Sequence, residues 1–199
     1  MPISSLPVTW ESYPNFFGRC YNWLMKFSLL SVYLERLEKT SSRIEITKIL
    51  AELLAKSDPE TVDKICYLVL GYLRPKYEGL VFNLAEKKVV EAISQGFAEE
   101  KAEVLADFRK KGDLGDVAYD LALKKGVKVK APTVEVVYER LFEIAQDEGE
   151  GSQERKVKSL AELLAQLDAL SAKFVTRIVL GKLRLGFSDK TILDALSWF

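Results

Sequence analysis

The sequence contains no histidine. This absence excludes catalytic triads and general bases built on imidazole, and every zinc site that needs an imidazole ligand. Cysteine is also scarce: Cys20 and Cys66 lie far apart and form no C-x-x-C pair. This usage indicates a reduced intracellular protein rather than a disulfide scaffold, and we expect Cys66, inside an apolar run, to be a buried structural thiol.

The chain also lacks a long apolar run and a net charge. Residues 1–24 have no basic start of the kind that secretory signals carry, and Arg19, Asn22 and Lys26 interrupt the apolar stretch there. We therefore expect a cytoplasmic protein with no membrane partner. Lys plus Arg and Asp plus Glu each number 29, so a nucleic-acid partner would have to be recognised through local charge.

Catalytic motifs are missing as well. The segment KKGDLG (110–115) is too short for a phosphate-binding loop and lacks the G-K-[ST] ending. Asp113 and Asp116 are close in sequence, but paired carboxylates at a helix start are more often caps than acid–base pairs. Nothing in the sequence marks an activated nucleophile, so we predict no catalytic residue and no metal site.

Apolar spacing predicts helices over nearly the whole chain. Serines at three predicted helix starts are expected N-caps: Ser42, Ser171 and Ser188. Gly96 is expected to end a helix, 126–132 reads as a linker with a possible short strand, and 147–153 is the most flexible-looking stretch. The predicted helices lie at about 25–39, 42–56, 58–74, 84–94, 99–111, 116–125, 133–146, 154–170, 171–184 and 188–198.

One stretch of the chain is repeated. KILAELLA (48–55) returns as KSLAELLA (158–165), and VLGYLRP returns as VLGKLRL. Across the 27-residue window 48–74, thirteen residues recur 110 positions later without a gap. A solenoid would need at least about three copies at a shorter spacing. Two copies instead predict a pseudo-two-fold domain with one shared core.

We therefore predict an all-α fold of about ten helices in two pseudo-two-fold-related halves. The halves are expected at about 25–96 and 133–199, connected by 97–132. Together they form one helical domain over 25–199. Residues 1–24 are expected to be an irregular N-terminal extension.

The segment 181–190 combines a helix end, a helix start and several cations. Gly186 can adopt the left-handed conformation that ends a helix, and Ser188 can cap the next one. Exposed amides at a helix start and nearby cations make a phosphate site; the cations here are Lys182, Arg184 and Lys190. The same residues also fit an ordinary helix–turn–helix with a solvated basic face.

The corresponding segment of the first half, 71–79, carries Arg74, Lys76 and Gly79, with Pro75 fixing its turn. Two similar anion-binding corners related by a pseudo-two-fold could each hold one strand of a duplex, which has two-fold axes of its own. Backbone amides can contact phosphate whatever the net charge of the protein.

A third feature is RKKGDLGD (109–116), where two glycines permit a tight turn before a new helix. Residues 108–130 hold seven basic and three acidic side chains, and charge sorted in this way is typical of a one-faced nucleic-acid binder. Lysine-rich helix ends are also common, and Asp113 can serve as an N-cap alone.

These segments, in this order, carry a family resemblance. The chain from about Met25 to Phe199 resembles the N-terminal DNA-binding domain of ATP-dependent DNA ligases of the archaeal and replicative type. The matching motifs are LERLEKTSSRIEITKILAELLA, LRPKYEGLVFNL, KKGDLGDVA, GEGSQERKVKSLAELLA and VLGKLRLGFSDKTILDALS. Each motif alone is moderately specific, whereas all five in order are strongly so.

The resemblance implies an all-helical domain that grips the minor groove of nicked double-stranded DNA on both sides of the nick. Such enzymes act in DNA replication, repair and recombination, and a prokaryotic one would associate with the nucleoid. By similarity the DNA contacts fall at Ser42 and Arg43; at Arg74, Lys76 and Gly79; at Gly112, Asp113, Leu114 and Gly115; at Gly151 and Ser152; and at Gly181, Lys182, Arg184, Gly186, Ser188 and Lys190.

The chain departs from a whole ligase in one respect. A whole ligase carries an adenylation domain with a K-x-D-G motif and an oligonucleotide-binding fold, and this chain has no K-x-D-G. ATP and Mg²⁺ therefore belong to the full-length family enzyme, and we expect no cofactor in this chain and no sealing activity from it alone. Expected partners are nicked duplex DNA, the other domains of the same enzyme and a sliding clamp. The competing interpretation is a helical protein-interaction scaffold that does not bind nucleic acid.

Overall fold

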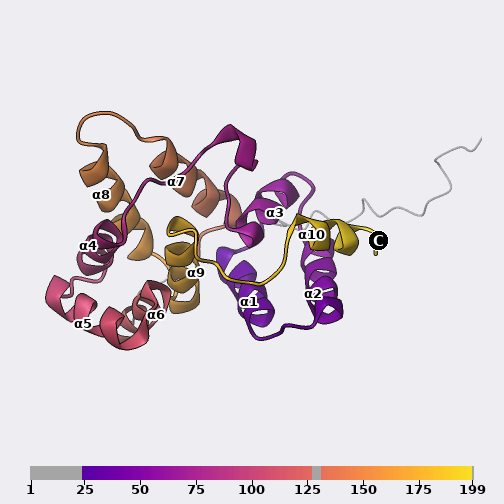
Figure 1. The fold of residues 1–199 in the computed structure, drawn as a ribbon, viewed down its shortest axis with the longest axis horizontal. Helices are drawn as coiled ribbons and strands as arrows, with labels where there is room; N and C mark the ends of the chain where they lie inside the picture. The colour runs from indigo at the N-terminus through magenta and orange to yellow at the C-terminus, as the bar shows by residue number, and fades with distance from the viewer. Residues whose placement is uncertain (1–23, 127–130, 199) are drawn as a thin grey trace, which may run out of the picture.

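The prediction of an all-α fold is confirmed by the structure, a computed structural model that describes residues 24–126 and 131–198 (Figure 1). In these residues the chain forms ten α-helices and a short 3₁₀ helix, η2. The elements are α1 (Phe27–Glu38), α2 (Arg43–Ala55), α3 (Val62–Leu70), η2 (Lys76–Glu78), α4 (Glu86–Gly96), α5 (Lys101–Lys111), α6 (Leu114–Lys125), α7 (Val134–Gln146), α8 (Ser152–Leu164), α9 (Ala169–Val179) and α10 (Asp189–Leu196).

Two of the three predicted N-caps stand at helix starts, and the third does not. Ser42 caps α2, where its hydroxyl accepts the Glu45 amide at 3.5 Å, and Ser188 occupies the N-cap position of α10 without a side-chain cap bond. The prediction that Ser171 is an N-cap is wrong. The Asp168 carboxylate accepts the Ser171 amide at 2.9 Å and therefore caps α9 three residues earlier.

The start of α3 was also predicted too early. The predicted helix began at residue 58, whereas α3 begins at Val62. Residues 58–61 instead form a turn in which the Asp58 carboxylate accepts the Glu60 amide at 2.8 Å. An Asx turn of this kind competes with the first helical turn for the same backbone donors.

α4 ends at Gly96, as predicted, but this glycine does not adopt the left-handed conformation of a helix-terminating glycine. It is the last residue of α4, and a Cβ built on it would lie 2.7 Å from the Ala161 carbonyl oxygen of α8. The missing side chain lets the backbones of α4 and α8 approach each other closely. This glycine therefore serves helix packing, whereas C-terminal glycines usually serve to stop a helix.

The helices of the two halves pack reciprocally. α4 belongs to the first half but packs on α8 of the second, and α10 belongs to the second half but packs on α2 of the first. α1 packs on α9 as α3 packs on α7. In Figure 1 α10 accordingly lies beside α2 at one end of the molecule and α4 beside α8 at the other.

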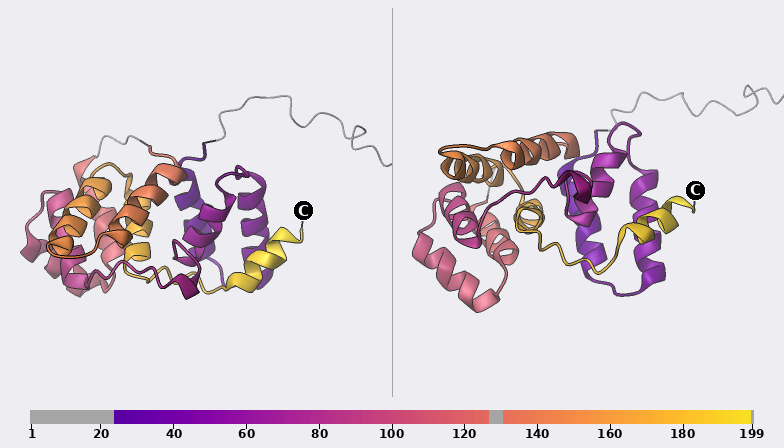
Figure 2. Two further views of the ribbon diagram at one scale, coloured as in Figure 1. Left: turned by 90° about the horizontal axis from the view of Figure 1, so that it is seen from above. Right: turned by 45° about the horizontal axis from the view of Figure 1, so that its top comes forward.

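Two long segments, 71–85 and 180–188, carry the chain between the halves. Both run along one face, which forms the lower edge of the left panel of Figure 2. We call them the first and the second crossing segment. Each begins with the same helix end: Gly71 and Gly181 are left-handed, and the amides that follow at Tyr72 and Lys182 bond back to the carbonyls of Tyr67 and Arg177 at 3.0 and 2.8 Å.

The halves share one apolar core, whose fully buried side chains include Phe27, Phe97 and Phe174. An isolated antiparallel bridge joins Lys26 to Thr133. The strand considered for the linker falls mostly on residues 127–130, which lie outside the described residues, as do residues 1–23 of the expected extension.

Cys66 is half-buried rather than fully buried as predicted, because it lies on the edge of the apolar face of α3. Burial raises the pKa of its thiol, and the nearby charge of Asp63 adds to this. Cys20 lies outside the described residues.

The loop before α8 is tied down, although the sequence predicted a flexible stretch. The Arg155 guanidinium donates to the Asp147 carboxylate at 2.5 Å and to the carbonyls of Glu150 and Glu148 at 2.8 and 3.2 Å. The glycines of this loop, Gly149 and Gly151, take left-handed conformations. A single cation thus organises a loop whose composition alone suggested mobility.

Candidate nucleic-acid interface

The two crossing segments present cations in the same pattern. Leu73 and Leu183, 110 residues apart, are buried, and the arginine that follows each of them is exposed: Arg74 and Arg184. The second segment continues this alternation with Leu185 buried. The backbone is not a regular strand here, since Arg184 is left-handed with a φ of +52°. The leucines therefore anchor each segment to the core while the arginines face solvent.

Four exposed cations of this face have no carboxylate partner among the described residues: Arg74, Lys76, Arg184 and Lys190. The Arg74 guanidinium lies 5.1 Å from the centre of the Phe142 ring, and the Lys76 ammonium 4.8 Å from that of Tyr72. A hydrogen bond to Tyr72 raises the pKa of Lys76. These charges are therefore available to an anionic partner.

The other two predicted cations are already paired. Lys182 contacts the Glu86 carboxylate, and Arg43 donates to Asp194 of α10 at 2.8 Å. Both pairs are exposed, so they cost little to break. The Lys182 pair joins the second crossing segment to the start of α4, and the Arg43 pair joins α2 to α10.

The starts of α2 and α10 meet at a cleft of about 310 Å³. This cleft brings together predicted residues that are far apart in sequence, because α10 crosses to the first half. Its lining comprises Ser41, Arg43, Ile46, Gly186, Phe187, Ser188, Lys190 and Thr191. Two helix starts with an arginine and a lysine beside them are suited to hold a phosphate group. Ser42, the cap of α2, lies next to this lining.

The turn at 112–115 is only partly available to a ligand. Gly112 is exposed and left-handed, but Leu114 and Gly115 are buried. The Asp113 carboxylate accepts the amides of Gly115 at 2.7 Å and of Asp116 at 3.2 Å. The amides of Gly115 and Asp116 are thus taken by the cap of α6.

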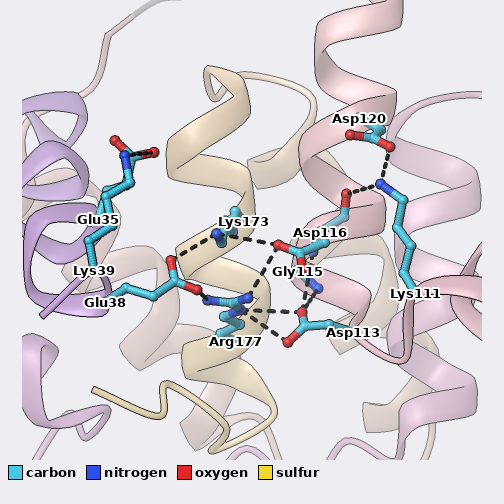
Figure 3. A network of polar contacts seen from close by, with 10 residues as sticks. All are labelled: Glu35, Glu38, Lys39, Lys111, Asp113, Gly115, Asp116, Asp120, Lys173 and Arg177. Carbon is cyan, nitrogen blue, oxygen red and sulfur yellow. Dashed lines mark hydrogen bonds and ion pairs between the residues drawn. The ribbon is translucent and has the colours of Figure 1, made fainter. Parts of the chain in front are cut away.

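Asp113 also belongs to a network around Arg177 (Figure 3). The Arg177 guanidinium, 7% exposed, pairs with Glu38 at 2.7 Å and with Asp113 and Asp116 at 3.2 Å each. Lys173 bridges Glu38 at 2.8 Å and Asp116 at 3.3 Å. Burial alone would raise the pKa of Asp113, but the hydrogen bond and charge of Arg177 and the two amides hold it below its usual value.

This network joins α1, α6 and α9, and sequence reasoning missed it. A Cβ on Gly115 would lie 2.8 Å from the Arg177 Cγ atom and 2.9 Å from the Lys173 carbonyl oxygen, so the glycine lets α6 approach α9. The sequence contains one sign of this network, because Arg177 interrupts the apolar run FVTRIVLG. A cation inside a buried helix face requires acidic partners from neighbouring elements.

Gly151 and Ser152 lie at the start of α8, away from the cleft between α2 and α10. The nearest cation is Arg155, which lies 3.1 Å from a Cβ built on Gly151 and is already paired with Asp147. Gly112, in contrast, lies close to Lys182 and Arg184, with which it lines a small hollow. The structure thus groups the predicted residues of the two crossing segments and Gly112 but separates Gly151 and Ser152 from these cations.

No helix within the described ranges is both long and apolar enough to cross a membrane.

Comparison with known proteins identifies relatives of the whole helical region. The family model described as the DNA ligase N terminus matches residues 26–197. A DNA ligase of Sulfolobus acidocaldarius is 42% identical over 184 residues, which cover 87% of this chain and 31% of that protein. DNA ligase 2 of Thermofilum pendens and a probable DNA ligase of Aquifex aeolicus are each 41% identical, over 87% of this chain and 30% of theirs.

The chain spans about 30% of the length of these curated relatives. The family match extends from Lys26, just before α1, to Ser197, just after α10. It therefore includes both crossing segments and the two helices that pack on the opposite half, α4 and α10. This chain therefore belongs to the DNA ligase N-terminus family.

Proposed function

We propose that this chain binds duplex DNA independently of sequence, through the phosphates and the minor groove on both sides of a nick. In this role it is the N-terminal part of an ATP-dependent DNA ligase that acts in replication, repair and recombination. The observation that carries the proposal is the pair of equivalent arginines, Arg74 and Arg184, exposed on one face and without carboxylate partners in the part of the chain that the structure describes.

The chemistry of the face suits a ligand that is recognised by shape and charge. Phosphate contacts fix the position of a protein on the duplex and carry no sequence information. The minor groove shows a degenerate pattern of donors and acceptors, which fits an enzyme that must seal any sequence. The names of the similar proteins support the proposal, since these proteins are called DNA ligases.

The sealing reaction belongs to other parts of the proposed enzyme. ATP and Mg²⁺ would act in the adenylation domain, whose K-x-D-G motif this chain lacks. What these residues contribute is binding: the charged face holds the duplex while the adenylation and oligonucleotide-binding domains close around it. A sliding clamp remains a proposed partner of the whole enzyme, and DNA binding would place it at the nucleoid in a prokaryote.

Binding of this chain to a nicked duplex tests the proposal. We expect similar affinity for nicked duplexes of unrelated sequence, with a logarithm of the binding constant that falls linearly and steeply with the logarithm of salt concentration. Fluorescence anisotropy at several salt concentrations measures both. Absence of duplex binding at low salt would favour the protein-interaction scaffold instead.

The double variant Arg184→Gln with Lys190→Gln tests the role of the second crossing segment. It should weaken binding evenly across sequences and reduce the magnitude of the salt slope by about two, because each cation that contacts a phosphate contributes about one. A loss confined to one sequence would contradict the phosphate role.

A matched control makes the same change of charge elsewhere. Lys158 on α8 and Arg140 on α7 are exposed and have no ion-pair partner among the described residues. We expect Lys158→Gln with Arg140→Gln to leave the salt slope at its original value. An equal reduction by this control pair would show that net charge, not the crossing segment, governs binding.

A further inference from the structure

The first crossing segment is held at both ends by side chains of the second half. The Tyr138 hydroxyl of α7 donates to the Leu73 carbonyl at its beginning. From α8, the Lys156 ammonium donates to the Phe82 carbonyl at 2.8 Å and the Gln153 amide to the Asn83 carbonyl at 3.1 Å. Residues 74–81, including Arg74, Lys76 and the 3₁₀ helix, therefore form a loop closed by donors at both ends.

Lys156 is an unusual residue to find at this position. It is 3% exposed, and its second hydrogen bond goes to the Ala145 carbonyl at 3.3 Å. Among the described residues no carboxylate pairs with it. Burying an ammonium with only neutral carbonyls as partners is costly. The equivalent residue of the first half, 110 positions earlier, is Ile46, which is buried at 4% exposure. An apolar side chain therefore fills the equivalent position in the first half, and packing alone does not require a lysine at 156.

What the ammonium adds is a fixed backbone. Asn83, next to the Phe82 carbonyl, has a φ of +51°, a left-handed conformation that asparagine adopts more readily than most residues, so the donors hold a turn that the sequence itself favours. The second crossing segment differs: among the described residues no side chain donates to a carbonyl of 181–187. Within the described ranges only the first segment is fastened by side-chain donors from the opposite half, although the second also contains a left-handed non-glycine residue, Arg184.

We propose that Lys156, with Tyr138 at the other end, is a positioning residue that holds the loop carrying Arg74 and Lys76 in its DNA-binding conformation. This inference rests on the proposed function. Lys156 contacts no DNA in this account; it acts through the backbone of the loop. A loop that is fixed before binding loses less conformational entropy when it meets the duplex.

The variant Lys156→Met separates positioning from folding. Methionine fills a similar volume without a buried charge, so we expect a thermal unfolding midpoint equal to or above that of the original chain. Affinity for nicked duplex should fall about tenfold, which corresponds to ordering one loop. The salt slope should stay unchanged, because no phosphate contact is removed. Amide hydrogen exchange within 74–85 should become faster.

The variant Tyr138→Phe tests the other end of the loop and retains the ring that stacks on Phe142. We expect the same combination of weaker binding, unchanged salt slope and faster exchange. Leu160→Met is the control, since it alters a buried residue one turn along α8 without removing a hydrogen bond to the loop; its binding should equal that of the original chain.

The outcomes distinguish the two proposals. Faster exchange with unchanged affinity in both Lys156→Met and Tyr138→Phe would overturn the role in DNA binding. Unchanged exchange within 74–85 would overturn the clamp itself. If the original chain does not bind nicked duplex, the proposed function fails and the DNA role of Lys156 fails with it, while the exchange comparison still decides whether the clamp exists.

Discussion

Asp113 has two roles at the start of α6, as the cap of this helix and as an ion-pair partner of Arg177. Its place in a glycine-rich turn among lysines suggested a DNA contact, and its place before a helix suggested a cap. The structure shows the cap, with the carboxylate bonded to two amides of α6, and adds an ion pair with Arg177. Only Gly112 of this turn stays exposed, so a DNA contact here would involve that residue more than its neighbours.

The charge of Asp113 can be tested apart from its cap. Asparagine also caps helices well, so Asp113→Asn removes mainly the ion pair with Arg177. We expect the free energy of unfolding at pH 7 to fall by about 2 kcal/mol, the size of a hydrogen bond between charged groups. Urea unfolding monitored by circular dichroism measures this loss.

The same variant should change the acid sensitivity. Because the pKa of Asp113 lies below its ordinary value of 3.8 in the fold, its ionised form stabilises the protein above that pH. This contribution disappears as the pH falls through the lower folded pKa. The difference between original and variant should therefore shrink below about pH 4. Asp168→Asn is the control, because Asp168 caps α9 without an ion pair among the described residues; a pH-dependent loss of equal size there would refute the account.

At the scale of helices, small residues decide which surfaces can meet. Gly96 allows α4 to contact the backbone of α8, and Gly115 allows α6 to contact α9. The sequence marks both glycines but does not tell their role. A glycine near a helix end predicts a stop as readily as a close approach, and only the partner helix distinguishes the two cases.

Gly96→Ala should therefore be destabilising although alanine favours helices. Propensity alone would stabilise α4 by about 1 kcal/mol, but the new methyl group would overlap the Ala161 carbonyl oxygen. We expect a net loss of about 2 kcal/mol, typical of overpacking in a tight interface. Urea unfolding measures the change, and a gain in stability would contradict the role in packing.

Gly112→Ala provides the comparison. Its φ is +71°, but a Cβ there meets nothing within 4 Å. We expect a smaller loss of about 1 kcal/mol, from the backbone conformation alone.

At the scale of the whole molecule, the exchange of α4 and α10 makes each half depend on the other. α2 is covered by α10, and α8 by α4, as both views in Figure 2 show. α6 also packs on α9 of the second half. Neither half contains all the elements that bury its own apolar faces, so the domain should unfold in one cooperative step.

Separate fragments test this interdependence. Residues 24–126 and 131–199, produced alone, should show low helicity and no cooperative unfolding transition, and mixing them should restore both signals in circular dichroism. A cooperative transition in either fragment alone would show that the halves are independent domains.

Much of this architecture could be predicted from the sequence because it depends on local or repeated patterns. Apolar spacing predicted ten helices, and the similar segments KILAELLA and KSLAELLA predicted two related halves. The crossing segments were singled out by glycine, proline and cations. Their DNA contacts, and the boundaries of the halves, stay predictions.

The sequence by itself determined the helices, their periodic apolar faces and the equivalence of Arg74 with Arg184. These follow from short-range rules of helix formation and from the repeat. Tertiary structure alone decided that α4 and α10 each pack on the opposite half. It also decided that Asp113 pairs with Arg177 and that Lys156 donates to the Phe82 carbonyl. Each of these joins residues more than 60 positions apart, and the free energy of such contacts depends on which surfaces the packed helices bring together.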